Sequence, residues 1–393
     1  MKVDVMSKEA VSKGAGRYVV GHVERFDQKN EMFKRPIWEP SQRHISEKFY
    51  IEEVMPKDKA GYMLKDQAFR NAAWYLELSF AMGISGGRVG LFAWESKLLG
   101  ETRPPKGLKM EVDDPAKVTR EIKKVAKFYG AALVGVSELD RRWLYSHTYY
   151  TFPHPKRHQP VEEIEIPEEY KYVVATAVEM DYEGIRTSPA LPAAGAVGLG
   201  YSKEAFVAGL LAQYIRGLGY KAIPTGNDTA CSIPIAIDAG LGELSRSGLL
   251  ITPEFGPRVR VSKVFTDLPL VPDKPIEFGV WDFCNKCQKC AEHCPSQAIM
   301  HGEPTTEINN ISNREGLFRW PIDAEKCISY WAANGASCSN CIRVCPFNKS
   351  SGWLHSAIRW GVKNTRWLDA TFVKLDDFFG YGKQVSAERF WEQ

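Results

Sequence analysis

Hydrophobic residues recur at helical spacing in three stretches of the chain, residues 66–82, 117–130 and 203–218. Apolar residues three and four positions apart share one face of an α-helix. Such a face is formed in the second stretch by Val118, Ile122, Val125, Ala126 and Tyr129, and in the third by Phe206, Leu210, Tyr214 and Leu218. Ser202 precedes the third stretch as a helix cap, and glycines follow the second and third, so we expect amphipathic helices that end there.

Short apolar runs between and after these helices predict β-strands at 131–136, 172–179, 220–224, 248–252 and 259–265. The last run alternates apolar and polar residues, which is typical of a strand with two different faces. The stretch 139–170 is aromatic at its start and acidic towards its end, and we interpret it as an insertion. Helices that alternate with strands indicate an α/β fold in which helices pack around a sheet.

The length of 393 residues exceeds that of a usual single domain and predicts two or three structural units. Hydrophobic residues at 44% and charged residues at 25% are ordinary for a globular protein. We divide the chain into an N-terminal unit at 1–116, a core at 117–278 that carries the insertion 139–170, a cysteine module at 279–350 and a C-terminal segment at 351–393.

Charge and hydropathy argue against two broad classes of protein. The formal net charge is only +3, with acids and bases interleaved, so no nucleic-acid surface is expected. No uninterrupted apolar stretch approaches the ~18 residues that span a bilayer. Residues 1–5 resemble neither a hydrophobic signal nor a twin-arginine leader, so we expect a cytoplasmic protein or a mature form without its export signal.

Eight of the nine cysteines fall in two runs that end in the same way. The first reads Cys284-x2-Cys287-x2-Cys290-x3-Cys294-Pro, and the second reads Cys327-x10-Cys338-x2-Cys341-x3-Cys345-Pro. Such runs bind 4Fe–4S clusters, and the last cysteine of each ferredoxin run ligates the other cluster. We therefore predict one cluster on Cys284, Cys287, Cys290 and Cys345, and a second on Cys294, Cys327, Cys338 and Cys341.

Zinc sites and disulfides are the competing interpretations of paired cysteines. Neither explains two runs that each end in x3-Cys-Pro. The long first interval of the second run is a departure from the ferredoxin pattern. The ninth cysteine, Cys231, is predicted to be a small buried residue and no ligand. The chain is therefore expected to transfer electrons.

Residues outside the cysteine runs connect the chain to a family. The segment 25–33 and the stretches around Tyr201, Asn227 and Arg260, together with both cysteine runs, resemble the respiratory reductive dehalogenases over nearly the whole chain. The resemblance implies a corrinoid and iron–sulfur enzyme that removes halogen from organohalides in organohalide respiration. It also implies a nitroreductase-like, cobalamin-binding core at 117–278, followed by a ferredoxin-like module with two 4Fe–4S clusters.

The resemblance further implies base-off binding of cobalamin, without a protein histidine on cobalt. The chain agrees, since it contains no Asp-x-His-x-x-Gly run. A G-x-G-x-x-G fingerprint after a strand is also missing, so we do not expect nicotinamide binding. Contacts with the corrin are expected, by analogy, at Thr252, Pro253, Phe255 and Gly256.

Three residues receive catalytic roles from the resemblance: Tyr201 as proton donor, Asn227 as the residue that orients its hydroxyl, and Arg260 as the cation that stabilises the phenolate. A phenol has an ordinary pKa near 10 and is protonated at neutral pH, and a nearby cation lowers that pKa. Arg258 is the alternate for Arg260. A structural interpretation stays open, in which Tyr201 packs at a helix entry, Asn227 forms a turn and Arg260 pairs with a surface acid.

Aromatic residues are abundant, at 12% of the chain, and are expected to line an apolar substrate pocket as well as a core. The pocket candidates are Trp331, Trp143, Leu144, Trp38 and Trp74. Core packing is the alternative role for Trp331.

We predict reductive dehalogenation of small chlorinated compounds, chloroalkanes or chloroethenes, by Co(I) cobalamin that receives two electrons through the clusters and a proton from Tyr201. The alternatives are an enzyme like the epoxyqueuosine reductases, which act on tRNA, and an iron–sulfur electron carrier without a substrate. Expected partners are the organohalide, a reduced electron donor and a small membrane anchor protein, without nucleic acid. The resemblance places the mature protein peripherally on the outer face of the cytoplasmic membrane, and a cytoplasmic location is the alternative.

Overall fold

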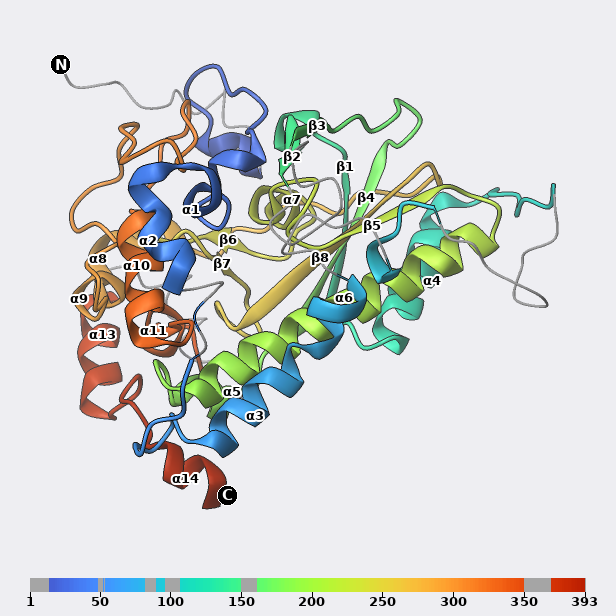
Figure 1. Ribbon diagram of the computed structural model, residues 1–393. Coiled ribbons are helices and arrows are strands. Elements are labelled where there is room, and N and C mark those ends of the chain that lie inside the picture. The colour runs from blue at the N-terminus through green and yellow to red at the C-terminus, as the bar shows by residue number, and fades with distance from the viewer. Residues whose placement is uncertain are drawn as a thin grey trace.

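The computed structural model describes residues 14–48, 52, 54–81, 90–95, 107–149, 161–349 and 369–392. The expectations for residues 1–5, for Met82, for residues 150–160 of the insertion and for 351–368 lie outside these residues. In the described part, a sheet with helices on both faces adjoins a module of short helices that carries the cysteines (Figure 1). The predicted α/β class is confirmed.

A four-stranded antiparallel sheet forms the centre of the core. Val174 pairs with Val136 on one side and with Val264 on the other, so the strand that carries it is central. Four of the predicted strands are present and are displaced by at most two residues at either end. In spatial order they are β1 (Leu133–Glu138), β4 (Tyr172–Glu179), β8 (Val259–Thr266) and β5 (Ala222–Thr225).

The remaining strands of the described residues form two smaller sheets of two strands each. The predicted strand 248–252 is shorter than expected, because only β7 (Leu250–Ile251) pairs, with β6 (Glu243–Leu244). Within the insertion, η9 (Arg141–Trp143) leads to β2 (His147–Tyr149), which pairs with β3 (Val161–Glu163).

Both faces of the central sheet are covered by helices. Successive side chains of a strand point to opposite faces, so Val264 shares one core with Leu211 while Phe265 shares another with Ile235. Ser262, Lys263 and Thr266 of β8 are buried between these layers, and Lys263 is fully inaccessible. The covering helices are α4 (Pro115–Phe128) and α6 (Leu191–Gly217) on one face and α7 (Ser232–Asp238) on the other.

Helix α6 begins much earlier than the sequence pattern indicates. The predicted start at Lys203 with Ser202 as cap is wrong, because the helix runs from Leu191 and Ser202 lies in its interior. Its first half consists of small apolar residues that are almost all buried, and a helix that is hydrophobic all round shows no amphipathic repeat. Ser202 instead donates a hydrogen bond to the carbonyl of Ala73 (2.7 Å).

Helix α3 (Leu64–Ala73) lies alongside α6 (Figure 1). The helix predicted over 66–82 is interrupted in the described residues, because α3 ends at Ala73 and a π-helical turn, η5, covers Glu77–Ala81. Two glycines of α6 permit the close contact. A Cβ on Gly195 would lie 2.5 Å from the ring of Phe69, and one on Gly198 would lie 2.3 Å from Trp74.

Short helices build the cysteine module: α8 (Val280–Cys287), α9 (Lys289–Glu292), α10 (Ala324–Asn334) and α11 (Asn340–Arg343). Helix α13 (Asp369–Phe378) is held against it by ion pairs of Lys289 with Asp376 (2.5 Å) and of Lys286 with Asp369 (3.0 Å). Helix α5 (Tyr182–Arg186) packs on α6, and α14 (Ala387–Glu392) reaches α3 through its Trp391.

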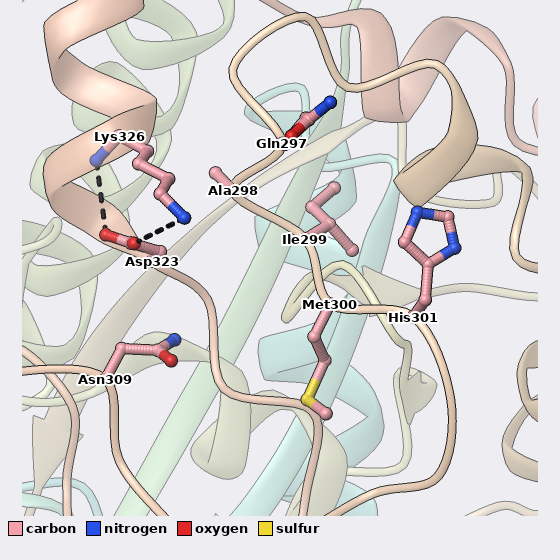
Figure 2. Close-up of a pocket in the computed structure, with 8 residues that line it drawn as sticks. All are labelled: Gln297, Ala298, Ile299, Met300, His301, Asn309, Asp323 and Lys326. Carbon is pink, nitrogen blue, oxygen red and sulfur yellow. Dashed lines mark hydrogen bonds and ion pairs between the residues drawn. The ribbon is translucent and has the colours of Figure 1, made fainter.

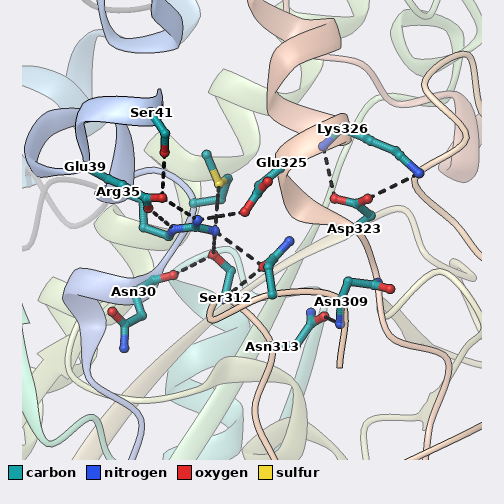
Figure 3. A network of polar contacts seen from close by, with 12 residues as sticks. Asn30, Arg35, Glu39, Ser41, Asn309, Ser312, Asn313, Asp323, Glu325 and Lys326 are labelled. Atoms are coloured by element: carbon teal, nitrogen blue, oxygen red, sulfur yellow. Dashed lines mark hydrogen bonds and ion pairs between the residues drawn. The ribbon is translucent and has the colours of Figure 1, made fainter. Parts of the chain in front are cut away.

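The N-terminal unit is tied to the module by Arg35, whose side chain is buried (Figure 3). Its guanidinium pairs with Glu39 (2.7 Å) and with Glu325 of α10 (2.7 Å), and it donates to Ser312 (3.1 Å). The short helices of this unit are η1 (Ala15–Tyr18), η2 (Gln28–Asn30), α1 (Arg35–Trp38), η3 (Pro40–Gln42), α2 (Arg43–Ser46) and η7 (Gly90–Phe92).

The domain boundaries stay a prediction. Among the described residues, no helix combines the length and apolar character needed to cross a bilayer.

The contact of α3 with α6 predicts opposite effects of one substitution at two glycines of α6. Alanine raises helix propensity by about 1 kcal/mol in a helix interior. At Gly217 an added Cβ meets nothing within 4 Å, but at Gly198 it would collide with Trp74. We expect Gly217→Ala to be neutral or stabilising and Gly198→Ala to lower the free energy of unfolding by about 1–3 kcal/mol in denaturant titrations. Equal stability of the two variants would contradict the contact.

Candidate active site and cysteine module

Tyr201 lies in the interior of α6, with its ring between an aromatic and a cationic side chain. The indole of Trp74 stacks on it, with ring centroids 5.0 Å apart and planes inclined by 24°. The guanidinium carbon of Arg260, from β8, lies 4.8 Å from the ring centroid. Gly200 makes room for that arginine, because a Cβ there would lie 2.9 Å from Arg260 Cγ. Tyr201 keeps part of its surface accessible, although protein surrounds it on most sides.

Asn227 fixes the hydroxyl end of the same tyrosine. Its Nδ2 donates a hydrogen bond to Tyr201 Oη (2.8 Å). The residue follows β5 in a loop that Asp228 organises, because the Asp228 carboxylate accepts from the backbone amide of Gly226 (2.8 Å) and from the hydroxyl of Thr229 (2.8 Å). Thr229 has a φ of 67°, a strained conformation for a β-branched residue. Such strain is typical of positions that the surrounding structure fixes for function.

The surroundings of Tyr201 oppose one another in their effect on its acidity. Burial raises the pKa of the phenol above its ordinary value, and the carboxyl groups of Glu204 and Glu77 raise it further. Arg260 lowers the pKa, as does the hydrogen bond from Asn227. Tyr201 is therefore protonated at neutral pH, and the two groups that favour its phenolate are the two that the resemblance singled out.

Glu204 and Lys263 belong to this site but were missed by the sequence analysis. Glu204 is buried one helical turn after Tyr201, and burial raises the pKa of its carboxyl well above the usual range. Glu77 adds to that increase, while Arg260 and Lys263 oppose it. The i, i+3 spacing from Tyr201 is the signal that could have found Glu204. Lys263 shares its strand with Arg260 but points to the opposite face, so no local pattern connects it to Tyr201.

Arg258 does not join the site. Its guanidinium donates to Asn348 (2.9 Å) and to the carbonyl of Met180 (2.7 Å), and it pairs with Glu179. These partners fasten the start of β8 to the end of β4 and to the cysteine module. Of the two arginines, the structure therefore brings Arg260 to Tyr201.

The pocket candidates occupy different places. Trp74 stacks on Tyr201, whereas Trp143 and Leu144 are buried in the core on the other face of the sheet. Trp331 packs beside Phe33 (ring centroids 5.7 Å), and in the described part of the chain its buried indole nitrogen has no hydrogen-bond partner. Trp38 is partly exposed and donates to the carbonyl of Lys29 (2.7 Å). Their role in binding a substrate stays a prediction.

The cysteines of the two runs gather in two neighbouring groups. Burial raises the pKa of Cys284 to about 11 and that of Cys287 and Cys327 to about 12. Burial also raises the pKa of Cys345, and Cys284 adds to this across the two runs. Burial likewise raises the pKa of Cys341, with further increases from the second group, Cys338, Cys327 and Cys294.

A buried thiol loses its proton readily when a positively charged metal centre binds its sulfur in place of that proton. A cavity in the module is lined by five cysteine side chains, Cys284, Cys287, Cys290, Cys341 and Cys345. Among the described residues, no group of three or more His, Cys, Asp or Glu side chains is arranged to hold a single metal ion. The donor set fits iron–sulfur clusters, which thiolates bind.

The turn at Thr252–Gly256 joins the core to this module. Its backbone is closed on itself, since Thr252 and Gly256 exchange amide-to-carbonyl hydrogen bonds (2.9 and 3.0 Å). Gly256 has a φ of 56°, and a Cβ there would lie 2.3 Å from the carbonyl oxygen of Phe347, which follows Cys345 by two residues. The predicted corrin contacts therefore lie in a turn that abuts the cysteine module.

A separate cavity of about 400 Å³ lies within the module (Figure 2). It is lined by Gln297, Ala298, Ile299, Met300, His301, Asn309, Asp323 and Lys326. None of these residues belongs to the surroundings of Tyr201, so the cavity is not the predicted substrate pocket.

Comparison with known proteins identifies the family. Residues 283–348 match the family described as a 4Fe-4S double cluster binding domain. The chain is 36% identical over 363 residues to the tetrachloroethene reductive dehalogenase of Sulfurospirillum multivorans. The alignment covers 86% of this chain and 72% of that protein. A solved reductive dehalogenase, reported with a mechanism for B12-dependent dehalogenation, matches with a TM-score of 0.69 and 25% identity. That match covers 93% of this chain and about half, 48%, of the other.

The chain therefore belongs to the reductive dehalogenases, oxidoreductases that act on carbon–halogen bonds. The predicted cofactors, cobalamin and two 4Fe–4S clusters, agree with this family and with the matched cluster domain. The alternative drawn from the tRNA-modifying enzymes is not favoured. An epoxyqueuosine reductase of Atelocyanobacterium thalassa is 34% identical, but over only 116 residues, 28% of this chain.

The geometry around Tyr201 predicts how its acidity depends on Arg260. Because the guanidinium lowers the pKa of the phenol, Arg260→Met is expected to raise that pKa further. An absorbance titration of phenolate formation, with the matching Tyr201→Phe protein subtracted, measures the change. Arg260→Lys keeps the charge and is the control. An unchanged pKa in Arg260→Met would show that the cation does not act on the phenol.

Proposed function

We propose that this chain catalyses reductive dehalogenation of small chlorinated compounds, chloroalkanes or chloroethenes. The observation that carries the proposal is the phenol of Tyr201, held by Asn227 (2.8 Å) under the guanidinium of Arg260, in a chain that also carries a double-cluster module. The relative from Sulfurospirillum multivorans, named for tetrachloroethene, supports this substrate class. In the balanced reaction, an organohalide, two electrons and one proton give the dehalogenated product and halide.

Tyr201 supplies the proton in this proposal. Its hydroxyl accepts the hydrogen bond of Asn227 and so keeps its own hydrogen available to a substrate. When that proton leaves, the phenolate is stabilised by the same amide and by the charge of Arg260. Proton transfer from a positioned side chain accelerates reactions by about 10²–10⁴-fold.

Cobalamin, when bound, supplies Co(I), the strongly reducing centre of the reaction. The chain fits such a group at Tyr201, since Nε of Arg260 and Oε2 of Glu204 are buried there and have no hydrogen-bond partner among the described residues. We propose that Thr252, Pro253, Phe255 and Gly256 contact the corrin, and that no histidine of the protein ligates cobalt.

When bound, the two clusters would supply single-electron transfer, and the cysteines of the two runs would hold them. We propose one cluster on Cys284, Cys287, Cys290 and Cys345, and the other on Cys294, Cys327, Cys338 and Cys341. The effect of Cys284 on the pKa of Cys345, which lies in the other run, supports the exchange of the last cysteines. Burial is the largest cause of the raised pKa of Cys290, followed by Cys284 and Cys345 of its own set and then by Cys341 of the other set. The two ligand sets are therefore close neighbours.

The substrate pocket is proposed to use Trp74 beside Tyr201, together with Trp331 and Trp38, whereas Trp143 and Leu144 lie in the core on the other face of the sheet and are not proposed to line it. Indole and aliphatic walls exclude water and favour small, apolar chlorinated compounds.

We further propose a peripheral location at the outer face of the cytoplasmic membrane, with a reduced electron donor and a small anchor protein as partners. The proposed domains are 1–116, 117–278, 279–350 and 351–393.

Replacement of the phenol by phenyl tests the proton donor. Tyr201→Phe removes the acidic hydrogen and retains the stack on Trp74, so turnover is expected to fall by about 10²–10⁴-fold with corrinoid and iron contents unchanged. Halide release from tetrachloroethene measures the rate. Tyr220→Phe, which removes a partly buried hydroxyl that donates to the carbonyl of Met110 (2.8 Å), is the control. Near-normal rates in Tyr201→Phe would remove the role of proton donor.

Separate cysteine substitutions test the ligand assignment. Cys345→Ala is expected to deplete the cluster bound by Cys284, Cys287 and Cys290, and Cys294→Ala the other cluster. Iron analysis and electron paramagnetic resonance of the reduced proteins distinguish the two. Cys231→Ala should retain both clusters. Loss of the same cluster in both variants would refute the exchange of ligands between the runs.

A further inference from the structure

A chain of hydrogen bonds connects Tyr201 to a buried lysine on the far side of the Asn227 loop. Lys263 Nζ donates to Ser232 Oγ (2.8 Å), and Ser232 Oγ donates to Asn227 Oδ1 (3.2 Å). Asn227 Nδ2 then donates to Tyr201 Oη (2.8 Å). Ser232 is the first residue of α7, and Lys263 lies in β8. The tyrosine of one helix is thus linked to the first turn of another.

The surroundings of Lys263 fit a charged ammonium group. Nζ donates to the carbonyls of Gly226 and Ala230 as well as to Ser232, so three acceptors surround it. An ammonium group has three donors and no acceptor, which matches this arrangement. The side chain is completely buried. Burial lowers the pKa of Lys263 below its ordinary value, and the acidic groups that face it, Asp228, Glu204, Cys231 and Glu31 in decreasing order of effect, oppose part of that decrease.

Lys263 determines the direction of each hydrogen bond in the series that leads from its ammonium group to Tyr201. Because Lys263 can only donate, Ser232 accepts from it and is left to give its single hydrogen to Asn227. An oxygen of the Asn227 amide must then face Ser232, so the NH2 group faces Tyr201. The reversed amide would accept the phenol hydrogen and withdraw it from any substrate. Hydrogen bonds that run in one direction from a charged donor also strengthen one another.

We propose that Ser232 and Lys263 are positioning residues that orient the amide of Asn227, so that it donates to the oxygen of Tyr201 and leaves the phenol hydrogen free for transfer. This inference rests on the proposed function of Tyr201. Lys263 also holds the loop through Gly226 and Ala230, and Ser232 does not contact those two carbonyls in the described hydrogen bonds. Substitutions at Ser232 therefore separate orientation of the amide from support of the loop.

The other charged groups that face Tyr201 come from three elements and remain in place in such variants. They are Arg260 of β8, Glu204 of α6 and Glu77 of η5. Arg260 favours the phenolate and the two carboxyl groups oppose it. A change in the acidity of Tyr201 on substitution of Ser232 is therefore attributable to the hydrogen-bond chain.

The test compares Ser232→Thr with Ser232→Val, which differ by one hydroxyl in nearly the same shape. Phenolate formation at Tyr201 is titrated by absorbance in the full chain without added corrinoid, with the corresponding Tyr201→Phe double variants subtracted. We expect Ser232→Val to raise the pKa of Tyr201 by about 1, a tenfold change in its ionisation. Ser232→Thr should retain the value of the unsubstituted protein.

Turnover of the protein loaded with corrinoid and clusters supplies the second readout. Ser232→Val is expected to lower kcat about tenfold or more with KM for tetrachloroethene nearly unchanged, and Ser232→Thr to restore kcat. Ser137→Ala is the control, because it removes a buried hydroxyl of β1 that has no hydrogen-bond partner within the residues that the structure describes. Lys263→Met should reproduce the effect of Ser232→Val on the phenol pKa if that variant folds.

An unchanged Tyr201 pKa in folded Ser232→Val would overturn the inference, whatever the turnover. Equal pKa values in the threonine and valine variants would do the same. The proposed function is judged separately, by halide release from the unsubstituted protein. Absence of that activity with an altered phenol pKa in Ser232→Val would preserve the hydrogen-bond chain and refute only the dehalogenation.

Discussion

The stabilisation of a negative charge on one largely enclosed phenol, that of Tyr201, is the constraint on which the site depends. Burial makes the Tyr201 phenolate costly, and two neighbouring carboxyl groups add to that cost. The amide of Asn227 and the guanidinium of Arg260 act in the opposite direction. An acid must hold its proton until it is needed and then release it, and this balance of opposing groups serves both requirements. The stacking indole of Trp74 fixes the ring between them.

The fold brings these groups together from distant parts of the sequence. Glycines in α6 let α3 and Arg260 approach the tyrosine closely, and the antiparallel sheet places β5 beside β8 so that the Asn227 loop meets Lys263. The turn at Thr252–Gly256 lies between this core and the cysteine module, where Gly256 meets the backbone of Phe347.

Much of this arrangement was predictable where a local pattern carries it. Strands β4 and β8 appear as continuous or alternating apolar runs, and the cysteine spacing alone identifies the cluster module. The start of α6 was not predictable from periodicity, because its first turns are small, apolar and buried on most sides. Ser232 and Lys263 could not be found from the sequence, because their connection to Tyr201 exists only after α6, α7 and β8 have packed together. Tyr201, Asn227 and Arg260 were found through family resemblance, and their contacts required the structure.

A crystal structure of the protein reconstituted without oxygen with cobalamin and both clusters would test the role of Tyr201 most directly. If Tyr201 donates the proton, its hydroxyl will face the bound corrin, Asn227 will still donate to that hydroxyl, and no side chain will ligate cobalt. A corrin bound away from Tyr201, or a histidine coordinated to its cobalt, would refute this arrangement.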